Sequence, residues 1–121
     1  MKRVNLIAIT FFYIAIGYSQ SYESYFNKGL TKYNLQDYRG AILDYNKALE
    51  INPKDAKAYF IRGLAKYHLQ DYQGAILDYS NVIELSPNNG VTYVNRGIAK
   101  DELQGYQGSI LDYNKAKKMN P

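Results

Sequence analysis

The chain repeats itself with one fixed period over most of its length, and this period constrains its fold more than any other feature. Glycine, tyrosine and proline all recur at the same spacing, as Gly29, Gly63 and Gly97, Tyr45, Tyr79 and Tyr113, and Pro53, Pro87 and Pro121. A fixed period of about 20–50 residues is typical of arrays in which each unit buries its apolar face only against its neighbours. The period divides the chain into units 22–55, 56–89 and 90–121.

The second unit shows why each unit is expected to form two helices. Tyr59, Arg62 and Lys66 lie three and four positions apart, which is the spacing of one helical face. Asp71 follows at the place of an N-cap, where a carboxylate accepts hydrogen bonds from free backbone N–H groups. Apolar residues over 75–83 then form a stripe on a second helix. The unit therefore predicts a helix, a short turn and a second helix.

This pattern resembles the tetratricopeptide repeat, a family with a 34-residue unit of two helices. The matching positions are Tyr25, Gly29, Ala41, Tyr45, Ala48 and Pro53 in the first unit, Tyr59, Gly63, Ala75, Tyr79, Val82 and Pro87 in the second, and Tyr93, Gly97, Ser109, Tyr113, Ala116 and Pro121 in the third. Val82 and Ser109 stand where the family has alanine, and both remain small. The resemblance implies an all-α fold, a right-handed α-solenoid of three antiparallel helix pairs, over residues 20–121.

A pair of opposite charges also recurs in each unit. A cation precedes each repeat glycine and an aspartate follows sixteen residues later, giving the pairs Lys28 and Asp44, Arg62 and Asp78, and Arg96 and Asp112. A planar guanidinium matches a carboxylate well. We therefore expect an architectural ladder of ion pairs between first and second helices, formed within or between units. A catalytic row of carboxylates is the alternative interpretation.

The N-terminal segment has the pattern of a secretory signal peptide. Lys2 and Arg3 precede an apolar run over 4–17, and small residues follow it. Residues 1–19 are therefore predicted to be a signal peptide that is cleaved before Gln20 or one residue later, which would place the protein in the periplasm or outside the cell. Two alternatives stay open: a membrane anchor formed by residues 4–17, and a buried core helix. The run is shorter than the roughly 20 apolar residues that span a membrane.

The third unit closes differently from the other two. Lys117 stands where Leu49 and Ile83 stand in the earlier units. Because a terminal repeat needs a polar outer face, we expect the array to end at this unit. We also expect Ile110 and Tyr113 to stay partly exposed, which leaves a homo-oligomer as an open alternative.

The family resemblance implies that the first helices line a concave face on which partner peptides bind. In this chain the family's lining positions hold apolar or aromatic residues in most places and acidic residues at one end. The candidate partner-binding residues are Phe26, Leu30, Tyr33, Phe60, Leu64, Tyr67, His68, Val94, Ile98 and Asp101. Such a surface favours an extended or helical peptide with apolar anchors. The competing interpretation is that Leu30, Leu64 and Ile98 only pack between repeats.

The family's best-known subtype clamps a C-terminal carboxylate with Lys, Asn and Arg side chains. The matching positions in this chain hold Phe26, Leu30, Ile61, Val91 and Asn95, none of which is a cation. The resemblance therefore does not predict a chaperone tail as the partner.

Composition and motifs exclude most catalytic classes. The chain has no cysteine and one histidine, which excludes disulfides, thiol catalysis and a multi-histidine zinc site. The net charge is +4, half of it from Lys2 and Arg3, and the predicted concave face has only Lys57 as a cation, so no nucleic-acid partner is expected. We predict a non-enzymatic scaffold, without cofactor or metal, that binds a partner protein or peptide. The alternative is a structural unit that self-associates through its array ends.

Overall fold

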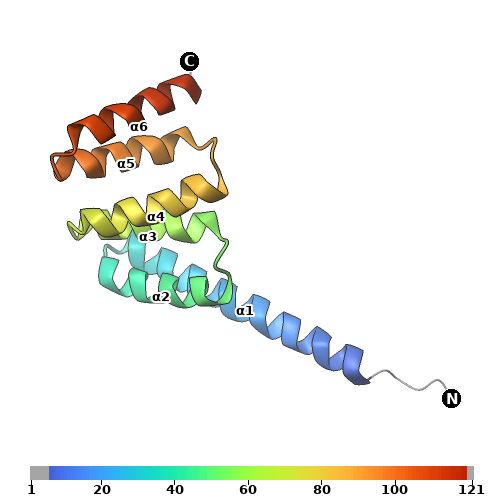
Figure 1. Ribbon diagram of the computed structural model, residues 1–121. Helices are drawn as coiled ribbons and strands as arrows, with labels where there is room; N and C mark the ends of the chain where they lie inside the picture. Colours follow the sequence, from blue (N-terminus) through green and yellow to red (C-terminus); the bar gives the residue numbers. More distant parts are fainter. Residues whose placement is uncertain (1–5, 120–121) are drawn as a thin grey trace.

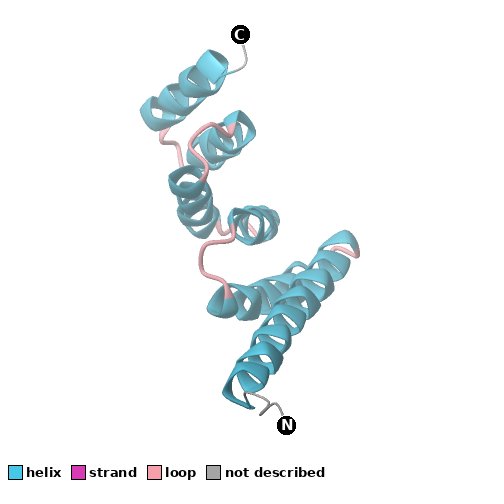
Figure 2. Cartoon of the chain, turned by 90° about the vertical axis from the view of Figure 1, so that its right-hand side faces the viewer, coloured by secondary structure: helices cyan, strands magenta, loops and turns pink. Residues whose placement is uncertain are grey.

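The computed structural model describes residues 6–119, which form six helices and no strand (Figure 1). The helices are α1 (Leu6–Asn34), α2 (Tyr38–Ile51), α3 (Ala56–His68), α4 (Tyr72–Leu85), α5 (Gly90–Glu102) and α6 (Tyr106–Met119). Figure 2, turned by 90°, shows the helices stacked along one direction, so the molecule is elongated. Consecutive helices pack in pairs, α1 with α2, α3 with α4 and α5 with α6, and the pairs contact each other through α2–α3 and α4–α5. The predicted all-α solenoid of helix pairs is confirmed.

The core of each pair depends on a tyrosine of the second helix that lies against a glycine of the first. A Cβ atom on Gly63 would lie 2.8 Å from the Tyr79 ring, and one on Gly29 would lie 2.8 Å from the Tyr45 ring. Tyr45 and Tyr79 are 0% and 1% exposed. The glycines therefore let the helices of a pair approach closely enough to bury a large aromatic ring between them.

The turns inside the pairs share a conformation that the periodicity did not predict. Gln36, Gln70 and Gln104 have φ angles of 64°, 63° and 60°, in the left-handed region that favours glycine. At the first turn the Asp37 N–H donates to the Lys32 carbonyl at 2.8 Å, which closes α1 with a left-handed C-terminal cap. This cap reverses the chain in a short turn and makes the two helices antiparallel.

Aspartate caps begin the second helices of the first two pairs. Asp37 Oδ1 accepts from the Gly40 N–H at 3.0 Å, and Asp71 Oδ1 accepts from the Gly74 N–H at 3.0 Å, as predicted for Asp71. A side chain on either glycine would collide with the capping carboxylate. The third pair has Gly105 in place of the aspartate, so Gly108 is free of this constraint.

The N-terminal part of α1 differs from the other first helices because it extends beyond the stack (Figure 1). Ile7, Phe11, Phe12 and Tyr13 are each more than half exposed, which is against the alternative of a buried core helix for the apolar run. Within residues 6–119 no helix combines the length and hydropathy needed to cross a membrane. Lys2 and Arg3, which support the predicted signal peptide, and Pro121 of the third unit lie outside the described residues.

We expect Gly63→Ala to lower the free energy of unfolding by about 1–3 kcal/mol, because the new methyl group overlaps the buried Tyr79 ring. Gly108→Ala is the matched control. Its Cβ meets the flexible Lys100 side chain at 3.3 Å, and alanine favours a helix over glycine by up to about 1 kcal/mol. Urea unfolding followed by circular dichroism measures both. Equal stabilities for the two variants would contradict the proposed role of the glycine–tyrosine contact.

Candidate functional site

Bidentate ion pairs join the helices of the second and third pairs. Arg62 donates from Nε and Nη2 to the two carboxylate oxygens of Asp78 at 2.9 and 2.7 Å. Arg96 makes the same two bonds to Asp112 at 3.0 and 2.8 Å. Both aspartates are buried, so the guanidinium supplies the hydrogen bonds that water would otherwise supply. These two predicted pairs are confirmed.

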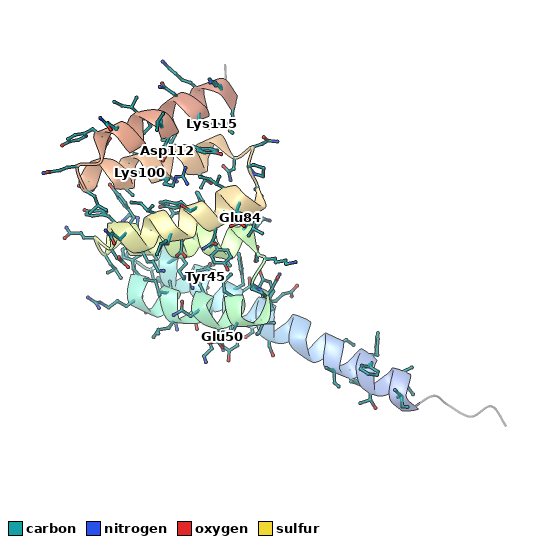
Figure 3. All side chains as sticks on the ribbon, viewed as in Figure 1. Tyr45, Glu50, Glu84, Lys100, Asp112 and Lys115 are labelled. Atoms are coloured by element: carbon teal, nitrogen blue, oxygen red, sulfur yellow. The ribbon has the colours of Figure 1, made fainter. Side chains whose placement is uncertain are left out.

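A lysine one turn after each arginine adds a second cation to the same carboxylate. Lys66 Nζ lies 3.1 Å from Asp78 Oδ2, and Lys100 Nζ lies 2.9 Å from Asp112 Oδ2. Figure 3 labels Lys100 on α5 and Asp112 on α6. Burial of the Asp112 carboxylate raises its pKa, but the hydrogen bonds and charges of Arg96 and Lys100 outweigh burial, and the net effect is a lowered pKa.

The first pair does not follow the predicted pairing. Lys28 does not bind Asp44; its Nζ lies 5.9 Å from the centroid of the Tyr25 ring. Lys32 takes its place, with Nζ 2.8 Å from Asp44 Oδ2. Lys32 stands one repeat period before Lys66 and Lys100, which bind the equivalent aspartates, so the first pair keeps this second cation of the pattern and lacks the bidentate arginine.

The arginines also connect neighbouring pairs. Arg62 Nη1 donates to Asn46 Oδ1 of α2 at 2.8 Å, and Arg96 Nη1 donates to Ser80 Oγ of α4 at 3.1 Å. Each guanidinium therefore connects the first helix that carries it to the second helix of its own pair and to the second helix of the preceding pair. The sequence left open whether the pairs form within or between units. The signal that was missed is that Asn46 and Ser80 are also separated by one repeat period.

Several predicted partner-binding residues meet at one hollow between α3 and α5. The hollow has a volume of about 210 Å³ and is lined by Leu64, Tyr67, His68, Tyr79, Asn95 and Ile98. Four of these lining residues were predicted to bind a partner, namely Leu64, Tyr67, His68 and Ile98. The wall of the hollow is largely apolar. Ile98 is 37% exposed, so part of this apolar surface is accessible.

The other predicted residues are distributed along the stack. Phe60 lines a hollow of about 340 Å³ with Lys57, and Phe26 lines one of about 390 Å³ with Glu23. Val94 lines a hollow of about 260 Å³ at the end of the array. Leu30 lines none of these hollows and is 37% exposed.

Tyrosines hold His68 at the edge of this surface. The imidazole stacks on the Tyr38 ring, with centroids 4.4 Å apart and an interplanar angle of 7°. Tyr33 Oη lies 3.4 Å from Nε2 of the same imidazole. The sequence indicated Tyr33 and His68 but missed Tyr38, although tyrosine recurs at this position as Tyr72 and Tyr106.

The acidic end of the predicted surface is hydrogen-bonded within the protein. Tyr113 Oη donates to Asp101 Oδ2 at 2.7 Å, and Tyr67 Oη donates to Glu102 Oε1 at 3.4 Å. Hydrogen bonds from Ser109 and Tyr113 lower the pKa of Asp101. Burial of the Tyr113 phenol, together with its hydrogen bond to Asp101, raises the pKa of Tyr113 to about 12. The phenol therefore stays protonated and donates to Asp101 at neutral pH. Asp101 therefore holds α6 against α5.

Over residues 6–119 the structure contains no cluster of three or more acidic or histidine side chains that would hold a metal ion. The arrangement offers apolar and aromatic contact surface on the first helices, with charged groups engaged mainly in holding the helices together.

Comparison with known protein families gives a match to the tetratricopeptide repeat over residues 22–55 and 56–89, more than half of the chain. The chain belongs to the tetratricopeptide repeat (TPR) family. The match does not extend to residues 90–121, so the third TPR unit stays a prediction from the repeat period, to which α5 and α6 correspond in position.

Solved structures with a similar fold include other TPR domains. The Arabidopsis OM64 TPR domain has a TM-score of 0.81 at 25% identity, covering 86% of each chain. The first TPR of Spaghetti (RPAP3), bound to the HSP90 peptide SRMEEVD, has a TM-score of 0.79 at 24% identity, covering 85% of this chain and 82% of that one. The TPR2B domain of yeast Sti1, in a pHsp70 complex, has a TM-score of 0.78 at 23% identity, covering 84% and 81%. The comparison with curated proteins gave no match.

We expect Arg62→Ala to lower the free energy of unfolding by about 3 kcal/mol, because Asp78 stays buried and loses its bidentate partner while Lys66 remains beside it. Lys28→Ala, at the equivalent position of the first TPR unit, removes no ion pair to Asp44 and should leave the stability unchanged. Thermal and urea unfolding test both. A fully stable Arg62→Ala variant would contradict the architectural role of the ladder.

The lowered pKa of Asp112 predicts the direction of acid sensitivity. A carboxylate whose folded-state pKa lies below its ordinary value of 3.8 stabilises the fold above that pH, and this stabilisation is lost as the pH falls through the folded-state value. Melting temperatures measured from neutral pH downward should therefore decline below pH 3.8. The Asp112→Asn variant should have a lower melting temperature at neutral pH than the unmodified protein. Its melting temperature should also fall by less when the pH is lowered. An equal loss in both proteins would show that this carboxylate does not contribute.

Proposed function

We propose that this TPR protein is a non-enzymatic scaffold that binds a partner protein or peptide on the surface formed by its first helices. The observation that carries the proposal is the hollow between α3 and α5, where Leu64, Tyr67 and Ile98 converge on largely apolar space. Accessible apolar hollows accept anchoring side chains of a partner. The RPAP3 and Sti1 structures, which are complexes with an HSP90 peptide and with pHsp70, support peptide binding as the mode.

The partner is recognised by apolar side chains and not by a terminal carboxylate. Phe26, Leu30, Ile61, Val91 and Asn95 occupy the positions from which the family's clamp subtype binds such a carboxylate. A carboxylate placed among them would lose its hydration without gaining a cation. The proposed ligand is therefore an internal segment of a protein, extended or helical, with hydrophobic anchors spaced by one helical turn or by alternate positions of an extended chain.

We further propose that the protein is exported and that residues 1–19 are removed as a signal peptide. Ile7, Phe11 and Phe12 in this segment are exposed. The N-terminal part of α1 extends beyond the stack (Figure 1), so removal of the segment leaves the helix pairs intact. Mass spectrometry of the protein recovered from the producing cell tests this, with a new N-terminus at Gln20 or Ser21 as the expected result.

We expect peptides selected from a random library against the purified protein to bind with equal affinity as free acids and as C-terminal amides. Tyr67→Ala combined with Ile98→Ala should weaken binding at least about tenfold, because both side chains line the hollow. Leu77→Ala combined with Leu111→Ala is the control, since these leucines are 67% and 70% exposed on the second helices.

Isothermal titration on folded variants gives the affinities. Loss of binding on amidation would overturn the apolar mode of recognition. Equal weakening by the control variant would show that the peptides do not bind on the first helices.

A further inference from the structure

The hydrogen bonds that join neighbouring helix pairs leave one donor and one acceptor unused at the two ends of the array. Within the array, Arg62 donates to Asn46 and Arg96 donates to Ser80. The next acceptor in this series is Asn114 on α6, one repeat period after Ser80. Its side chain is exposed, and no following first helix supplies a donor to it within residues 6–119.

The donor end of the series is Lys28 on α1, one repeat period before Arg62. Its ammonium lies over the Tyr25 ring, as the guanidinium of Arg62 lies over the Tyr59 ring at 5.5 Å. Lys28 is exposed and makes no ion pair with Asp44, which is bound by Lys32. This cation therefore occupies the connecting position without an acceptor from a preceding pair.

The C-terminal end of the array is also incompletely covered. Tyr113 is only half-buried, whereas the equivalent Tyr45 and Tyr79 are covered by a following pair. A hollow of about 260 Å³ opens beside it, lined in part by Val94 and Ala116. Within residues 6–119 no first helix of a following pair packs on α6, whereas α3 packs on α2 and α5 packs on α4.

We propose that a second copy of this chain supplies that helix, so that α1 of one copy docks on α6 of another, head to tail, with Lys28 Nζ donating to the side-chain oxygen of Asn114. The contact continues the α2–α3 and α4–α5 interfaces by the same repeat. The contact joins two different surfaces and repeats the translation that the stacked helix pairs already follow along one direction (Figure 2), so it adds copies end to end and produces short open chains.

Two polar residues, Lys117 and Ser24, keep this contact weaker than the interior ones. In the interior, Leu49 of α2 and Ala58 of α3 belong to one buried cluster. Their equivalents at the ends are Lys117 and Ser24, which bury less apolar surface. The association is therefore reversible and concentration-dependent. Lys117→Ile strengthens it, because this variant places at position 117 the residue that the second unit has at Ile83.

Sedimentation equilibrium of the full chain over a concentration series up to about 1 mM tests the proposal. The average mass should rise with concentration, and Lys117→Ile should increase the association constant at least tenfold. Lys115→Ile is the matched control, since Lys115 is also exposed on α6 (Figure 3) and precedes Lys117 by two positions in the sequence. An equal increase with the control, or a monomer at every concentration, would overturn the proposal.

The direction of the contact is tested separately by charge exchange. Asn114→Lys should abolish association by opposing Lys28 with a like charge, and adding Lys28→Glu should restore it. Association that survives Asn114→Lys would overturn the assigned contact.

The absence of cysteine allows a third test. Lys28→Cys and Asn114→Cys proteins should be linked by a short bis-maleimide when mixed and not when each is treated alone. Linkage of either protein to itself would indicate a symmetric dimer and overturn the head-to-tail arrangement.

Discussion

The contact between a second-helix tyrosine and a first-helix glycine sets the spacing of each helix pair, and the rest of the molecule depends on it. The ring of Tyr45 or Tyr79 fills the space that a larger residue at Gly29 or Gly63 would occupy. Burial of these rings is complete only where another pair follows, because Tyr113 at the end of the array stays half-buried. Each pair is thus stabilised by its neighbour, which is the general property of repeat arrays.

Arg62 and Arg96 fix how the helix pairs stack on one another. Buried aspartates are costly unless they are paired and hydrogen-bonded, and Asp78 and Asp112 meet this requirement through bidentate arginines. The remaining guanidinium nitrogen reaches back to the preceding pair, so one side chain fixes both the angle within a pair and the register between pairs. These contacts also fix the hollow between α3 and α5, because Leu64, Tyr67 and Ile98 project from the same first helices.

Period and residue type predicted the helices, the Asp71 cap and two of three ion pairs, because each depends on residues at fixed spacing. The pairing of Asp44 with Lys32 in place of Lys28 was missed, although Lys66 and Lys100 recur at the position of Lys32 and bind the equivalent aspartates. The stacking of His68 on Tyr38 joins helices α2 and α3, and local periodicity says nothing about such contacts. The left-handed glutamines break the usual preference for glycine, so propensity alone would not locate those turns.

Native-state amide hydrogen exchange tests most directly whether each pair depends on its neighbours. We expect the slowest exchange in α3 and α4, which have a pair on both sides, and the fastest among the array helices in α6, whose Tyr113 lies under no following pair. Equal protection of α3, α4 and α6, or strongest protection in α6, would contradict stabilisation by neighbouring pairs.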